Sequence, residues 1–129
     1  KNFYSIFLYN SLQYVVLGST KKTNNKKGKV LFMKLRVVMT NGVNYLIESG
    51  EFKDKDLMSA LLKFHSDDWG ILCNEDKEFQ NELLKNPNSK YEDRFMGVYM
   101  INGHKIWIMS EYDYSIKSLL ITILLPEEY

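Results

Sequence analysis

The chain has 129 residues, of which 45% are hydrophobic and 14% aromatic, and its formal net charge is +1. This length and apolar content are typical of one domain with its own core, and they exclude a chain that is disordered over most of its length. A single cysteine, Cys73, excludes an intramolecular disulfide and favours a reducing compartment.

Charge is unevenly distributed, and the imbalance sets residues 1–32 apart. These residues hold six lysines and no acid, whereas residues 33–129 hold eleven basic and sixteen acidic side chains, a net charge of −5. Residues 3–17 are mostly apolar, but they are shorter than the roughly 20 apolar residues of a membrane-spanning helix. The basic cluster follows this apolar part, which is the reverse of a signal peptide.

Residues 1–32 allow two interpretations. They can be translated upstream sequence, because the codons of residues 27–29 can form a purine-rich ribosome-binding site three codons before Met33. Alternatively, residues 3–17 form a genuine N-terminal strand, and the basic residues 21–29 form a loop that contacts nucleic acid. We expect the first, so the predicted domain begins at Met33, and the intact mass of the native product tests this.

A short strand and a first helix are predicted at the start of the domain. Residues 35–39 are apolar or β-branched apart from Arg36, and they predict a short strand or an extended entry to the domain. Thr40 or Asn41 can then cap a helix through a side-chain oxygen. Gly50 predicts the end of this helix, because glycine readily adopts the left-handed conformation that follows a helix C-terminus.

Two further helices follow. Asp54 is the predicted N-cap of the second helix. Its apolar residues recur at helical spacing and predict one buried face: Leu57, Leu61 and Phe64. Asn74 is the predicted N-cap of the third helix, which the later Asn-Pro-Asn sequence ends because proline cannot continue a helix.

The last third of the chain predicts three antiparallel strands, at residues 94–101, 104–110 and 119–125. Asn102-Gly103, between the first two strands, is typical of a type I′ hairpin turn because both residues tolerate positive φ. The predicted fold is therefore a single α+β domain, in which short helices precede a three-stranded antiparallel meander.

Trp69 and Gly70 lie in the predicted loop between the second and third helices. An exposed indole there would be typical of an anchor residue in a binding surface. The alternative is that Trp69 folds back to close the core, with Gly70 allowing the tight turn.

Acidic residues flank this loop on both sides: Asp67, Asp68, Glu75 and Asp76. Carboxylates are ligands for hard cations, but their spacing matches no calcium-binding loop. Helix capping and a solvated surface are the simpler interpretation. A surface that mimics phosphate for a nucleic-acid-binding partner is a third interpretation.

The predicted hairpin carries the other candidates. Lys105 and Trp107 share one face of the returning strand, and an aromatic ring beside a lysine can stack a nucleic-acid base. The alternative is an ordinary sheet surface without a ligand. The net negative charge of residues 33–129 favours this alternative, because nucleic acid is also negatively charged. Glu111 and Asp113 follow as two acids, the residue type that general acid–base catalysis uses, but no motif predicts a cleft around them.

No motif predicts a catalytic residue or a cofactor. Cys73 with two histidines is too small a set for a usual zinc site, and a Cys–His pair needs a contact that spacing does not predict. A metal-dependent hydrolase that uses Asp68, Glu75 and Glu111 is the most distant hypothesis.

Four segments form a pattern in chain order. They are Asp68-Trp69-Gly70, Glu75-Asp76 with Asn81, Lys105-Ile106-Trp107-Ile108 with Glu111 and Asp113, and Leu125-Pro126-Glu127-Glu128-Tyr129. This pattern resembles a family of small bacterial proteins carried on plasmids and integrative elements, over residues 37–129. Ile71 and Tyr114 depart from it, since family members usually have an acid and an arginine there. The resemblance implies a cytoplasmic, mobile-element context without an established activity.

We therefore predict a cytoplasmic accessory protein that is not an enzyme, has no cofactor and binds another protein. Its candidate binding residues are Trp69, Gly70, Glu75, Asp76, Asn81, Lys105, Trp107, Glu111 and Asp113. A nucleic-acid-binding regulator is the alternative, and it depends on residues 21–29. No association with a membrane is expected.

Overall fold

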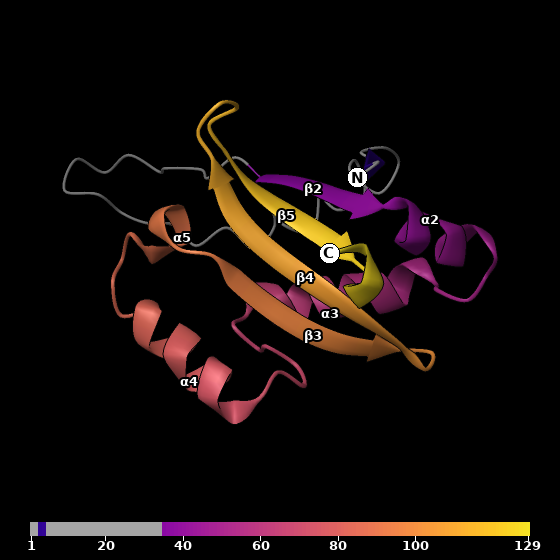
Figure 1. The fold of residues 1–129 in the computed structure, drawn as a ribbon, viewed down its shortest axis with the longest axis horizontal. Helices are drawn as coiled ribbons and strands as arrows, with labels where there is room; N and C mark the ends of the chain where they lie inside the picture. The colour runs from indigo at the N-terminus through magenta and orange to yellow at the C-terminus, as the bar shows by residue number, and fades with distance from the viewer. Residues whose placement is uncertain (1–2, 5–34) are drawn as a thin grey trace.

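The computed structural model describes residues 3–4 and 35–129. Its central element is a mixed five-stranded sheet. The strands are β1 (Phe3–Tyr4), β2 (Leu35–Thr40), β3 (Phe95–Ile101), β4 (His104–Asp113) and β5 (Ser118–Leu124). They lie in the order β1-β2-β5-β4-β3 (Figure 1). β2 runs parallel to β5, and the other neighbouring pairs are antiparallel.

The interpretations of residues 1–32 stay predictions. Only residues 3–4 of this segment are described, and they pair with the end of β2, with Phe3 opposite Thr40. The basic residues 21–29 lie outside the described residues.

The predicted meander is correct for β3, β4 and β5, but the expected count of three strands is wrong. Asn102 and Gly103 have φ angles of 48° and 80°, as the predicted hairpin turn requires. β2 adds a parallel strand beside β5, with Val37 opposite Ile121. The whole helical region separates β2 from its partner, so no local turn signal could place it in the sheet.

Four α-helices connect β2 to β3: α2 (Asn41–Glu48), α3 (Asp54–His65), α4 (Asn74–Leu83) and α5 (Ser89–Glu92). The three predicted helices are confirmed, and together with the sheet they confirm the α+β class. The predicted N-caps of α3 and α4 are wrong, because Asp54 and Asn74 are the first helical residues and the N-caps are Lys53 and Cys73. α5 is a single turn, too short to produce a hydrophobic period.

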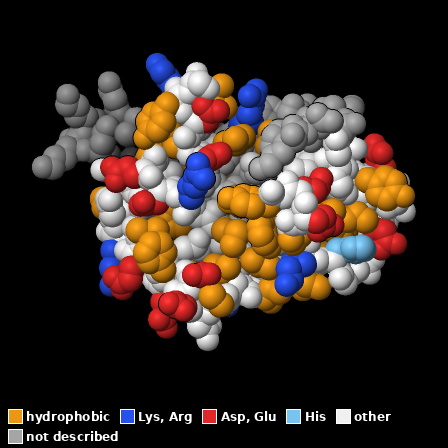
Figure 2. All heavy atoms as spheres, viewed as in Figure 1, with side chains coloured by type: hydrophobic (Ala, Val, Ile, Leu, Met, Phe, Trp, Pro, Cys, Tyr) orange, Lys and Arg blue, Asp and Glu red, His pale blue; other side chains and the backbone are white. Residues whose placement is uncertain are grey.

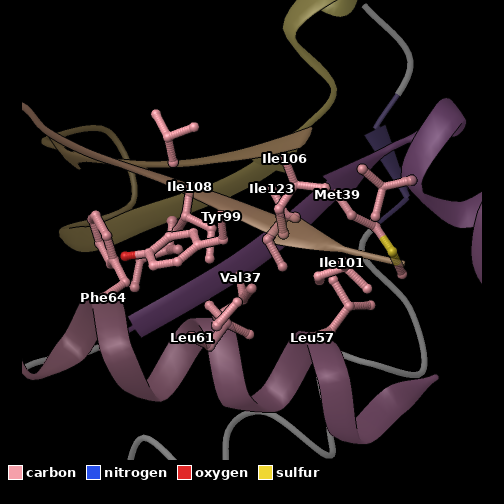
Figure 3. Packing of buried hydrophobic residues seen from close by; sticks show 14 of the residues in the cluster. Val37, Met39, Leu57, Leu61, Phe64, Tyr99, Ile101, Ile106, Ile108 and Ile123 are labelled. Atoms are coloured by element: carbon pink, nitrogen blue, oxygen red, sulfur yellow. The ribbon is translucent and has the colours of Figure 1, made fainter. Parts of the chain in front are cut away.

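The hydrophobic core lies between α3 and one face of the sheet (Figure 3). α3 contributes the predicted stripe of Leu57, Leu61 and Phe64, none of which is more than 6% exposed. Ile106 and Ile108 of β4 face this helix and are completely buried. Burial of each such side chain is worth about 1.5–3 kcal/mol, so the stripe is what holds α3 to the sheet.

The closing turn η1 (Pro126–Glu128) reaches the start of α2. The Glu128 carboxylate accepts hydrogen bonds from the Thr40 hydroxyl and from the Gly42 backbone N–H, the latter at 3.0 Å. Thr40 is the N-cap residue of α2, as predicted, but it donates its hydroxyl to Glu128 and makes no side-chain cap bond. The Glu128 carboxylate makes the capping hydrogen bond instead. A Cβ at Gly42 would lie 2.7 Å from this carboxylate, which explains a glycine in the first turn.

Candidate functional site

The structure separates the predicted binding residues into three groups. One group meets beside the outer edge of β3: Trp69, Gly70 and Asn81. The others lie along β4 (Lys105, Trp107, Glu111 and Asp113) and in the first turn of α4 (Glu75 and Asp76). The predicted residues therefore do not form one site.

Trp69 is part of the core. It is 3% exposed, and its ring stacks on Phe95 and meets Phe64 edge-on, with centroids 5.6 Å apart in both pairs. The indole N–H donates to the side-chain oxygen of Asn81 at 2.9 Å. Of the two roles considered for Trp69, core closure is the one the structure shows, and Asn81 supplies the partner that a buried indole requires.

Gly70 brings the Trp-Gly loop (residues 69–71) against the edge of β3. The Val98 backbone donates to the Trp69 carbonyl at 3.0 Å and accepts from the Ile71 N–H at 2.8 Å. Gly70 has a φ of 69°, and a Cβ there would lie 1.9 Å from the Val98 carbonyl oxygen. Only glycine fits this position, so the Trp-Gly sequence has a structural cause.

Tyr99 binds the residue that precedes the same loop. Its hydroxyl donates to the Asp68 carbonyl at 2.7 Å, and the Asp68 carboxylate accepts the Gly70 N–H at 3.0 Å. Burial raises the pKa of the Tyr99 phenol, and the negative charge of Asp68 raises it further. Tyr99 therefore acts as a neutral hydrogen-bond donor.

Gln80 is an important residue that the sequence analysis missed. Its side chain is 7% exposed, donates to the Met96 carbonyl at 2.9 Å and accepts from the Met96 N–H at 2.7 Å. The amide thus occupies the position of a neighbouring strand at the edge of β3. One signal was present: Gln80 precedes Leu83 and Leu84 by three and four residues, which is the spacing of a helix face that packs inward.

Lys105, Trp107 and Glu111 share the outer face of the sheet, on the side away from α3. They alternate along β4 with Ile106 and Ile108, which are completely buried. Because successive strand residues point to opposite faces, the prediction that Lys105 and Trp107 share a face is confirmed.

Apolar side chains of three strands lie on this outer face. Figure 2, which views this face, shows a cluster of hydrophobic side chains near its centre. This outer patch consists of Met96, Met100, Trp107, Met109 and Leu120. Val98 and Leu124 lie on the same face of the sheet but are buried, with exposures of 7% and 2%. Met100 is 51% exposed, and Met96, Trp107 and Met109 are half-buried. In the described part of the chain, α3 lies behind the sheet and no helix longer than one turn covers the patch (Figure 1).

Charged and aromatic groups border the outer patch. At the hairpin end, η1 brings Tyr129 against Trp107, with ring centroids 5.6 Å apart. At the other end, Glu111 forms an exposed ion pair of 3.2 Å with Arg94. Asp113 accepts hydrogen bonds from the hydroxyl and the backbone N–H of Ser115, and these bonds lower its pKa. Each of these two acids thus has a partner of its own.

The remaining acids lie at the surface. Glu75 and Asp76 are exposed in the first turn of α4, where carboxylates interact favourably with the helix dipole. Among the described residues, no three His, Cys, Asp or Glu side chains form a group that could hold a metal ion. Asp68, Glu75 and Glu111 therefore do not come together, and Cys73 is an exposed thiol at the start of α4.

The described residues also contain no helix with the length and apolar character that crossing a membrane requires. Comparison of the chain with protein-family models, with curated protein sequences and with solved structures finds no match in any of the three.

Proposed function

We propose that this protein acts by binding another protein through the outer patch. The supporting observation is an apolar surface that extends over three strands and that no helix longer than one turn covers in the described chain. Apolar patches with polar borders are typical of protein-binding surfaces. The patch is centred on Trp107, and tryptophan is enriched among the residues that carry most of the binding energy in interfaces.

The composition of the patch indicates the kind of partner surface. Three of its members are methionines, whose unbranched side chains can adapt to a partner's shape: Met96, Met100 and Met109. Lys105 lies at one end and the Arg94–Glu111 pair at the other. We therefore expect a partner surface with an apolar centre and charged groups at two opposite borders.

The cellular setting is also a proposal. We place the protein in the bacterial cytoplasm, as a non-enzymatic accessory protein of a mobile genetic element. The support is the sequence resemblance over residues 37–129 and the single cysteine, which suits a reducing compartment.

Photo-crosslinking of the full chain in its native host tests the proposed surface. A photoreactive residue in place of Met109, two residues from Trp107 on the same face, is expected to capture one partner protein of defined mass. The same residue in place of Glu78, exposed on α4, is expected not to capture it. Crosslinks from both positions alike, or only between two copies of this chain, would refute the proposal.

Substitution of Trp107 then tests the energetics with the captured partner in purified form. Trp107→Lys is expected to weaken binding by at least about tenfold, because it places a charge in an apolar contact. Phe79→Lys is the matched control, since Phe79 is 64% exposed on α4, away from the patch. Equal effects of the two substitutions would contradict a role for this face.

A further inference from the structure

A groove of about 750 Å³ lies between α3 and the outer edge of β3. One wall is α3, and the other is the strand and turn at residues 98–102. Gly70 and Ile71 of the Trp-Gly loop bound one end, and Gly50 and Glu51 bound the other. The groove opens from the edge of β3, whereas the outer patch lies on the face of the sheet.

Three residues of β3 direct their backbone N–H and C=O groups away from β4, and two of them already have hydrogen-bond partners on that side. Gln80 binds both backbone groups of Met96, and the Trp-Gly loop binds both groups of Val98. Met100 is the third. The two-residue hairpin turn directs the hydrogen bonds of Ile101 toward β4, so those of Met100 point away from β4, toward the groove. Within residues 35–129, no backbone group bonds to Met100 on that side.

The charge of the groove is opposite to the charge of the described domain. Residues 35–129 hold sixteen acidic and only ten basic side chains. Three of these ten line the groove: Lys53, Lys55 and Lys63. Of the two carboxylates that also line it, Glu51 already accepts a hydrogen bond from Asn102 at 3.1 Å. The groove therefore favours a ligand with negative charge.

We infer that an extended acidic peptide of a partner protein binds in this groove as an additional strand. Its backbone pairs with the N–H and C=O of Met100, its acidic side chains face Lys55 and Lys63, and its apolar side chains contact Ile71, which is 57% exposed. Addition of a strand to an open sheet edge is a recurrent mode of peptide recognition. Met100 belongs to the outer patch through its side chain and to the groove through its backbone. Trp107 does not line the groove, and Lys55 and Lys63 do not belong to the patch, so substitutions at these residues test the two surfaces separately.

Selection from a display library of random short peptides, against the full-length chain, tests the ligand class. Peptides in which acids alternate with β-branched residues are expected to be enriched. The double substitution Lys55→Glu/Lys63→Glu is expected to lower the affinity of the chain for a selected synthetic peptide by at least about tenfold. Lys85→Glu, at an exposed position just after α4 and outside the groove, is the matched control and is expected to change affinity by less than about twofold.

Amide hydrogen exchange tests the strand pairing. A bound strand accepts the Met100 N–H, so exchange of that amide is expected to slow by at least about tenfold when the selected peptide is added to the wild-type chain. Met100→Pro removes this donor and is expected to abolish binding. An edge strand tolerates proline where the N–H points away from the sheet, and a thermal unfolding curve checks that this variant folds.

Three outcomes overturn the inference: no acidic peptides are enriched, the two lysine substitutions leave affinity unchanged, or exchange at Met100 is not slowed. The wild-type exchange measurement decides the matter even where Met100→Pro does not fold. A second copy of this chain as the occupant also overturns it. That case would appear as a dimer that Met100→Pro converts to monomers and that the selected peptide does not displace.

Discussion

Gly70 combines a positive φ with a close approach to the Val98 carbonyl, and substitutions at Gly50 and Gly70 can separate the energetic costs of the two. Gly50 has a similar φ of 84°, but nothing lies within 4 Å of a Cβ built there. Gly50→Ala is therefore expected to cost only backbone strain, about 1 kcal/mol of unfolding free energy. Gly70→Ala adds a clash with the Val98 carbonyl and is expected to cost at least about 3 kcal/mol. Urea unfolding measures both, and equal losses would contradict the close approach.

Tyr99 gives the domain a defined alkaline sensitivity. Burial raises its pKa above the ordinary value of 10.0, so the folded protein keeps a proton that the unfolded chain releases above that pH. The contribution to stability is complete below about pH 10 and declines as the pH rises further. Tyr99→Phe is expected to lose about 1 kcal/mol at neutral pH, since the Asp68 carbonyl loses its donor, and to show a shallower alkaline decline.

Unfolding free energies at neutral and alkaline pH test this prediction. Tyr45→Phe is the control, because Tyr45 is 69% exposed. It is expected to leave both the neutral stability and the alkaline decline unchanged. An alkaline decline in Tyr99→Phe as steep as in the wild type would refute the role of the buried phenol.

At the scale of single residues, the sequence identified several important positions but not what they contact. Trp69 and Asn81 were both candidate binding residues, with core closure as the other role of Trp69, and the structure shows that they hydrogen-bond each other. Trp107 was placed on the correct face because strand alternation is a local rule. Gln80 was missed because its role depends on Met96, which the chain reaches only after α4 and α5.

Among the elements, α4 covers one part of the edge of β3, because its Gln80 binds the backbone of Met96. Gln80→Leu leaves the N–H and C=O of Met96 without partners, so a loss of about 2 kcal/mol in unfolding free energy is expected. The exposed edge is also expected to increase aggregation, measured by light scattering during storage. Wild-type stability in Gln80→Leu would contradict this function of α4.

Elements with a local signal were predicted well. The stripe on α3 and the Asn-Gly turn each lie within a few consecutive residues, and both are present. β2 was recognised as a strand, but its parallel partner lies beyond all four helices. The groove beside β3 was not predicted for the same reason: its two walls, α3 and β3, come from segments far apart in the sequence.

At the scale of the whole molecule, one core joins α3 to the sheet, so the domain is expected to unfold in a single transition. Trp107→Phe leaves the buried Trp69 as the sole tryptophan, and its fluorescence reports on that core. The midpoint from fluorescence is expected to equal the midpoint from circular dichroism, which reports on all helices and strands. Two distinct midpoints would show that part of the fold unfolds independently.

The hydrogen bond that the Gly42 N–H donates to Glu128 joins residues 86 positions apart. The capping partner of α2 is therefore synthesised long after the helix itself. β2 likewise waits for β5, its parallel neighbour. Contacts between such distant segments slow folding, because the intervening chain must be ordered before they form. During synthesis, the apolar stripe of α3 emerges before β3, β4 and β5 exist to cover it, so we expect the nascent chain to aggregate more readily than the folded domain.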